Sequence, residues 1–90
     1  MSREDAGEEA RRLRWRCRRG MKELELLLGS FLERGYAGLD EAGRAAFVRL
    51  LEHPDPVLAG WLLGQSVPMD GEIARVVRAI RAAAAPRAGA

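Results

Sequence analysis

The chain has 90 residues, of which 48% are hydrophobic and only 6% aromatic. This supplies one modest aliphatic core and leaves too little material for a second domain. The formal net charge of +2 is too small to define a partner by itself. Cys17 is the only cysteine, so an intramolecular disulfide and a cysteine-based zinc site are excluded, and a reducing compartment fits best.

The N-terminal region carries Glu4, Asp5, Glu8 and Glu9. A secretory signal would need an apolar run here, and a mitochondrial transit peptide would avoid acidic residues. No stretch approaches the roughly 18 to 20 apolar residues that a membrane-spanning helix needs. We therefore expect a cytoplasmic protein that does not enter a membrane.

The first helix is predicted over residues 2 to 17, with Ser2 as its N-cap and acidic residues in the early turns, where the helix dipole favours them. A dense basic block follows these acidic residues along the chain and comprises Arg11, Arg12, Arg14, Arg16, Arg18, Arg19 and Lys22. A block of this density indicates either an acidic or phosphate-bearing partner or a solvated face.

The second helix is predicted from a stripe of apolar residues at steps of three and four. The stripe comprises Met21, Leu24, Leu27, Leu28, Phe31 and Leu32. We expect this helix to end near Arg34, with Gly35 in the left-handed conformation that commonly stops a helix.

Three aspartates mark the starts of three further helices. Asp40 is the expected cap of the third, which His53-Pro54 ends, Asp55 is the expected cap before Pro56 in the fourth, and Asp70 caps the fifth. The residues expected to face inward from the third and fifth helices are Ala46, Phe47, Leu50, Leu51, Ile73, Val76, Val77 and Ile80, and the short fourth helix holds Leu58, Trp61, Leu62 and Leu63. Arg75, Arg78 and Arg81 should face outward.

No window of the sequence alternates as a β-strand does. We therefore predict an all-α fold: a single compact domain over residues 1–90, built as a bundle of four to five short helices. The tail, about 82–90, is expected to fray because its alanine, proline and glycine residues offer little to bury.

The segment Arg19-Gly20-Met21-Lys22-Glu23 places a cation, a residue without Cβ and a carboxylate at the expected start of the second helix. One interpretation is structural: with Gly20 as the cap, Glu23 bonds back to the helix start and pairs with Arg19. The other is a contact surface, and the residues alone favour the structural interpretation because capping glutamates are common.

The residues around this motif change that balance. They are Trp15, Cys17 to Leu24, Phe31-Leu32-Glu33, Tyr36, Arg49-Leu50-Leu51-Glu52, Asp55-Pro56 and Trp61-Leu62. Together they resemble the small FAD assembly factors of succinate dehydrogenase, which promote covalent attachment of FAD to the flavoprotein subunit. The resemblance covers Leu13 to Trp61 and implies a five-helix fold.

The resemblance implies that Arg19, Gly20 and Glu23 contact the flavoprotein. Glycine would let the partner's backbone approach, and arginine would offer a planar fork of donors to a carboxylate, a carbonyl or a flavin phosphate. Arg12, Trp15 and Arg18 are expected to extend the same surface. The family also has an acidic patch around its Asp-Pro element, which here is reduced to Glu52 and Asp55.

The remaining candidates are assigned structural roles. Tyr36 and Trp61 are expected in the core or at its rim, His53 at a helix end or on the surface, and Cys17 as a small, partly buried residue whose neighbouring arginines would favour the thiolate. No catalytic or metal-binding set is recognised.

The expected function is therefore that of a non-catalytic assembly factor. Its partner is the flavoprotein subunit of succinate dehydrogenase, with that of fumarate reductase as a second candidate. The chain should act as a monomer, without membrane or nucleic acid, and should bind no cofactor tightly itself. The alternative is a small basic nucleic-acid-binding or regulatory protein that uses Arg11 to Arg19 and the ring of Trp15.

Overall fold

The computed structural model describes the backbone of residues 3–84 and the side chains of residues 8–84. Within residues 3–84 the chain forms helices and no strand, which confirms the predicted all-α bundle. The elements are α1 (Arg3–Arg16), α2 (Lys22–Arg34), the 3-10 helix η1 (Tyr36–Gly38), α3 (Glu41–Leu50), α4 (Asp55–Leu62) and α5 (Gly71–Ala84). The predicted cap Ser2 lies outside the described residues.

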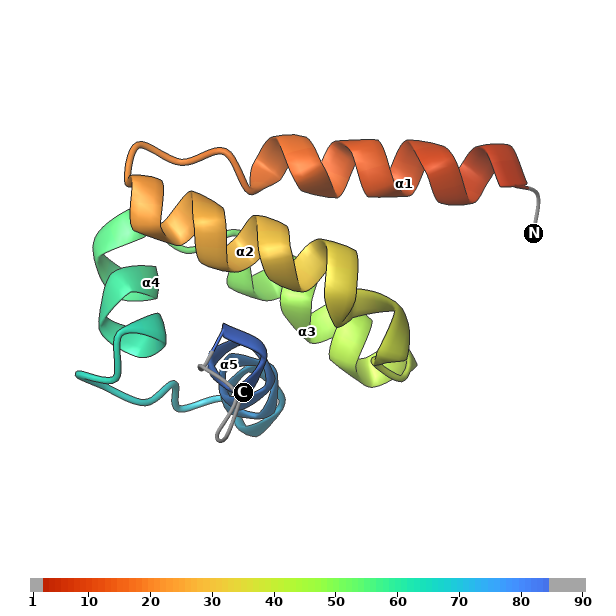
Figure 1. Ribbon diagram of the computed structural model, residues 1–90. Coiled ribbons are helices and arrows are strands. Elements are labelled where there is room, and N and C mark those ends of the chain that lie inside the picture. The colour runs from red at the N-terminus through yellow and green to blue at the C-terminus, as the bar shows by residue number, and fades with distance from the viewer. Residues whose placement is uncertain (1–2, 85–90) are drawn as a thin grey trace, which may run out of the picture.

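Helix α5 is the centre of the packing, because α2, α3 and α4 all contact it. In Figure 1, α5 is seen end-on below α2, and α4 stands at one end of the bundle. Helix α1 lies along α2 with the opposite chain direction (Figure 1), and α2 is the main element against which it packs. The connections α1–α2 and α3–α4 consequently meet at the same end of the molecule (Figure 1).

The core follows the predicted apolar pattern closely. Its largest fully buried side chains are Phe47, Leu24, Leu28, Leu50, Leu58, Ile80 and Val76. The ring of Phe47 packs against Phe31 and Tyr36, with centroid distances of 5.7 and 5.4 Å. One residue of the predicted apolar stripe does not reach the core: Met21 is 37% exposed, because it lies at the start of α2. Leu63, at the end of α4, is 45% exposed.

Two of the predicted caps are confirmed. The Asp40 carboxylate accepts a hydrogen bond from the Gly43 amide at 2.8 Å, and Asp70 accepts bonds from the amides of Glu72 and Ile73 at 2.9 and 3.1 Å. These bonds satisfy amides that have no partner inside their own helix.

The predicted cap at Asp55 is wrong. Pro54 occupies the N-cap position of α4, with an extended backbone and no side-chain cap bond, and Asp55 is already helical. The carboxylate of Asp55 instead points to the α1–α2 connection, where it bonds Arg19 and Gly20.

Gly35 ends α2 for a reason other than the predicted one. Its backbone has φ −120° and ψ −22°, so it is not left-handed, and its amide donates to the carbonyl of Phe31. The ring of Phe31 lies against the residue, and a Cβ on Gly35 would come within 2.7 Å of Phe31 Cδ1. The absence of a side chain is therefore required by close packing.

Three helix boundaries also differ from the prediction. Helix α1 ends at Arg16, so Arg19 does not lie on its face one turn beyond Trp15. Helix α2 begins at Lys22 with Met21 as its N-cap, not with Gly20. Helix α5 continues to Ala84, into the range expected to fray, and the rest of that tail lies outside the described residues.

A matched pair on α2 tests the core assignment. Leu28 is 0% exposed and Leu26 is 64% exposed, so the same substitution should have very different costs. Leu28→Ala should lower the free energy of unfolding by about 2 to 5 kcal/mol through lost burial and a cavity, and Leu26→Ala by less than about 0.5 kcal/mol. Urea denaturation followed by circular dichroism measures both, and equal losses would contradict the assignment.

Candidate functional site

The predicted motif lies in the connection between α1 and α2. This connection sits beside the start of α4 at one end of the bundle (Figure 1). Residues 17–21 lie between the two helices, so their conformation depends on contacts outside the helical hydrogen bonds.

Arg19 supplies most of those contacts, and it is directed into the molecule. Its Nε donates to Oδ1 of Asp55 at 2.8 Å. Its Nη1 donates to the carbonyls of Arg16 at 3.1 Å and Leu51 at 3.0 Å, and its Nη2 donates to the carbonyl of His53. Only 14% of the side chain is exposed, so Arg19 binds the ends of α1 and α3 and the first residue of α4 together.

This arrangement replaces the predicted pairing of Arg19 with Glu23. Glu23 is exposed in the first turn of α2, and its carboxylate forms no ion pair within the described side chains. It is the second residue of the helix, because Met21 is the N-cap, and so it is not the capping residue that the structural interpretation required.

Gly20 is exposed and holds its place through its backbone. Its amide donates to Oδ2 of Asp55 at 3.2 Å. A Cβ on Gly20 would lie 3.8 Å from the same oxygen, an ordinary contact, and the backbone is not in the left-handed region. The fold therefore accepts a side chain here, so packing does not explain the glycine.

Of the other predicted contact residues, Arg12 and Trp15 lie on α1, and Arg18 lies just beyond its end, in the α1–α2 connection. Trp15 is 69% exposed, and the guanidinium carbon of Arg18 lies 5.1 Å from the centre of its ring, a cation–π distance. Arg12 is exposed and pairs with Glu8 at 3.5 Å. These side chains line a shallow hollow with Arg11 and Arg14, so Arg12, Trp15 and Arg18 are brought together as predicted.

Cys17 is buried, with 3% exposure. Burial raises the pKa of its thiol to about 11, against a smaller opposing effect of Arg19 and Arg16. The neighbouring arginines do favour the thiolate, as predicted, but desolvation of the charged form outweighs their attraction. The thiol is inert and belongs to the core.

The aromatic and histidine positions have structural roles, as predicted. Tyr36 is half-buried and its hydroxyl donates to Glu9 at 2.9 Å, which ties α1 to η1. Burial, with the Glu9 bond, raises the pKa of Tyr36 to about 12. Trp61 is half-buried and packs edge-on against His53 at 4.8 Å, and the Nδ1 of His53 lies 3.1 Å from the carbonyl of Arg49 near the end of α3.

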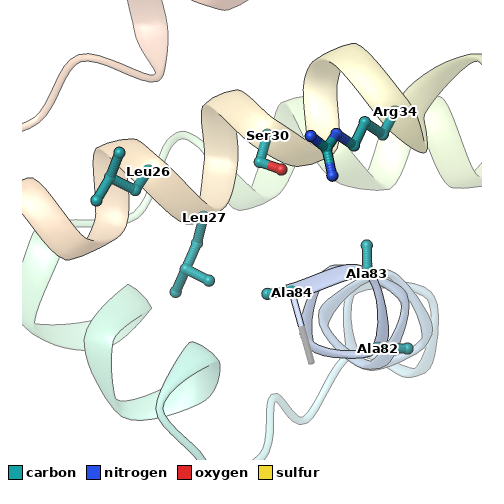
Figure 2. Close-up of a pocket in the computed structure, with 7 residues that line it drawn as sticks. All are labelled: Leu26, Leu27, Ser30, Arg34, Ala82, Ala83 and Ala84. Atoms are coloured by element: carbon teal, nitrogen blue, oxygen red, sulfur yellow. The ribbon is translucent and has the colours of Figure 1, made fainter. Parts of the chain in front are cut away.

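A groove between α2 and α5 lies apart from the motif. Figure 2 shows Leu26, Leu27, Ser30 and Arg34 of α2 on one side and the alanines at the end of α5 on the other. One hydroxyl and one guanidinium among short apolar side chains make no arrangement for chemistry. Within the described side chains, no group of three His, Cys, Asp or Glu residues is placed to hold a metal, and none of the helices described is long and apolar enough to span a membrane.

Comparison with known proteins supplies the family. A family model described as "Flavinator of succinate dehydrogenase" matches residues 11–84, a range that includes the motif and every residue that holds it. The chain belongs to this flavinator family.

Relatives in the same family carry a consistent name. The FAD assembly factor SdhE of Shewanella oneidensis is 45% identical over 75 residues, which cover 83% of this chain and 92% of the relative. SdhE of Pectobacterium atrosepticum is 43% identical over 70 residues, with 78% and 80% covered. SdhE of Coxiella burnetii is 40% identical over 72 residues, with 80% and 88% covered.

Sequence reasoning missed the role of Asp55 in this site. Its signal in the sequence, Asp before Pro, is the signal of a helix cap, and it gives no indication of a partner 36 residues earlier. A half-buried arginine next to the motif glycine needs a carboxylate, but the fold alone decides which of the chain's carboxylates can reach it.

Two glycines test whether the fold requires Gly20. Gly20→Ala should change the free energy of unfolding by less than about 1 kcal/mol, since the new methyl group meets no obstacle. Gly64→Ala should lower it by at least about 1 kcal/mol, because Gly64 has φ +85°. Chemical denaturation of both variants measures this, and a larger loss at Gly20 than at Gly64 would show that the fold itself needs the motif glycine.

The thiol of Cys17 gives a second test. With a pKa of about 11 in the folded chain against 9.0 for an ordinary thiol, alkylation by iodoacetamide at pH 8.5 should be slower in the folded than in the unfolded chain, on the order of 100-fold. Because the pKa of the thiol is higher in the folded chain than in the unfolded one, the folded state is favoured while the thiol stays protonated. This contribution of Cys17 to stability is complete below about pH 9 and is lost as the pH rises through about 11. Equal alkylation rates would place the thiol on the surface.

Proposed function

We propose that this chain is an assembly factor that binds the flavoprotein subunit of succinate dehydrogenase and promotes the covalent attachment of FAD to it. The match to the flavinator family over residues 11–84 carries the proposal. The exposed surface around Gly20, next to a firmly held Arg19, supports it, because such a surface suits recognition of another protein.

The chain assists the reaction without performing chemistry itself. The motif offers a backbone segment, a carboxylate and a guanidinium but no nucleophile with an adjacent base, and the thiol of Cys17 is protonated and buried. The bond to FAD is then formed by a residue of the client. The assembly factor binds the attachment-competent conformation of the client more tightly than other conformations, and so raises its population.

The contact surface has two parts in this proposal. Gly20 and Glu23 form the first, where the bare backbone of Gly20 lets the client approach and the exposed carboxylate of Glu23 accepts hydrogen bonds. Arg12 and Trp15 of α1 form the second with Arg18, which follows the helix, and their aromatic ring and guanidinium groups suit an interface with an acidic rim. Arg19 contributes indirectly, because its inward hydrogen bonds hold the backbone next to Gly20.

The finer features of the proposal follow from this mode of action. The factor acts as a monomer in the cytoplasm, without membrane or nucleic acid, binds one client at a time and is then released. It holds no FAD tightly, because the flavin belongs to the client. The flavoprotein subunit of the related fumarate reductase is proposed as a second client.

The test measures covalent flavin directly. We expect strong in-gel flavin fluorescence from denatured succinate dehydrogenase flavoprotein subunit when this protein is present, and weak fluorescence without it or with Gly20→Arg. The arginine side chain would obstruct docking at an exposed position where a Cβ meets only Asp55 Oδ2 at 3.8 Å, so the variant should remain folded.

Circular dichroism of Gly20→Arg and the fluorescence of Gly20→Ala are the controls. A folded Gly20→Arg variant that still supports full flavin attachment would refute the docking assignment. Equal fluorescence in all samples would refute the proposed function and favour the nucleic-acid alternative, for which the exposed Trp15 and its arginines are the specific observation. That alternative requires affinity for single-stranded nucleic acid that falls steeply with salt.

A further inference from the structure

The donors of Arg19 are almost fully used inside the molecule. A guanidinium group has five N–H donors, and four hydrogen bonds from Arg19 to Asp55, Arg16, Leu51 and His53 engage four of them. With 14% of the side chain exposed, little of the planar fork remains for a client.

Asp55 completes the arrangement with both of its oxygens. Oδ1 accepts from the side chain of Arg19 at 2.8 Å, and Oδ2 accepts from the backbone amide of Gly20 at 3.2 Å. One carboxylate therefore fixes a side chain and the next backbone amide of the motif at the same time. It lies in the first turn of α4, which gives it a rigid support.

The carbonyl acceptors of Arg19 have a physical reason to be there. Arg16 is the last residue of α1, and Leu51 and His53 belong to the turn that ends α3. Carbonyls at helix C-termini have no partner within the helix and carry partial negative charge, which a guanidinium satisfies well. Arg19 thus donates hydrogen bonds to the free carbonyls at the C-terminal ends of α1 and α3. The carboxylate of Asp55 neutralises the charge of the guanidinium.

We infer that Asp55 is a positioning residue for client recognition and that Arg19 acts through the conformation of the Gly20 segment, not as a ligand of the client. The inference rests on the proposed function, because client binding is its readout. Loss of Asp55 would release the Gly20 amide and let residues 17–21 sample conformations in which Gly20 and Glu23 no longer face the client together.

Asp55→Asn separates this role from direct binding by Arg19. The asparagine side chain keeps its size, but an NH2 donor replaces one of the two acceptor oxygens and the negative charge is lost. It therefore cannot hold Arg19 and the Gly20 amide in their present geometry, in which each bonds a different oxygen. If Arg19 were a ligand of the client, loosening it would preserve or strengthen binding. If Asp55 positions the motif, binding weakens.

The experiment is a titration of the purified flavoprotein subunit with the full-length chain and its variants, with covalent flavin as a second readout. We expect Asp55→Asn to raise the Kd about tenfold, which corresponds to a binding-competent fraction of roughly one tenth. Flavin attachment at saturating factor should return to the unmodified level, because saturation restores the competent state. The amide resonance of Gly20 should shift, since it loses a charged acceptor.

Asp70→Asn is the matched control. Asp70 also accepts backbone amide bonds at a helix start and pairs with an arginine, Arg49, at 3.2 Å, but it caps α5 and does not contact residues 17–21. Its substitution should lower stability while leaving the Kd within about twofold of the unmodified value. Equal weakening by both variants would attribute the effect to general stability and overturn the inference.

Two further outcomes are informative. Unchanged or tighter binding by Asp55→Asn would overturn the inference and make Arg19 a client ligand. If the unmodified protein itself fails to bind the flavoprotein subunit, the proposed function fails. The Gly20 resonance then decides the local claim, and an unmoved resonance in Asp55→Asn would refute it.

Discussion

The α1–α2 connection depends on a single guanidinium group held in a largely enclosed position. Arg19 bonds the carbonyls that end two helices and the carboxylate that begins a third. Each of these acceptors would otherwise need water or another donor at a site with little access to either. Because a half-buried arginine is costly without a carboxylate, Arg19 and Asp55 have to be considered as one unit. The shape of the surface around Gly20 follows from that unit.

The residues of the motif therefore point in two directions, into the molecule and into solvent. Arg19 is directed inward and determines the backbone, whereas Gly20 and Glu23 are exposed. The fold does not need the glycine, since a Cβ would meet only Asp55 Oδ2 at 3.8 Å. Gly35 is different, because the ring of Phe31 leaves no space for a side chain there. Packing therefore gives no reason for the glycine at position 20, which agrees with the docking role proposed for it.

Local patterns in the sequence were sufficient for most of the fold. The apolar periodicity of α2 and α5 predicted their buried faces, and Asp40 and Asp70 were correctly predicted as caps, because each of these features depends on residues within one or two helical turns. Asp55 has the same local signature as those caps. Its actual partners lie 35 and 36 residues away, and no local rule can choose a tertiary ion pair over a cap.

The conformation of the segment from Arg19 to Glu23 was predicted only in part. Family resemblance pointed to the segment from Arg19 to Glu23, and the spacing paired Arg19 with Glu23 because residues four apart are neighbours on a helix. That rule fails here because α2 begins at Lys22, so Arg19 lies before the helix. One shifted helix start changed the expected role of Arg19 from an outward-facing ligand to an inward-facing support.

Arg19 also fixes the position of α1, which carries Arg12 and Trp15. The carbonyl of Arg16, which ends α1, is one of the acceptors of Arg19, so the guanidinium that fixes the Gly20 segment also fixes the end of the helix that carries Trp15. Leu13 and Cys17 anchor the inner face of α1 in the core, while Trp15 remains 69% exposed on the outer face. An exposed tryptophan on a firmly anchored helix loses little conformational freedom when a partner covers it, so more of the contact energy is retained as affinity. Arg19, paired with Asp55, thus fixes the end of α1 and the Gly20 segment relative to each other, and so also the two parts of the proposed contact surface.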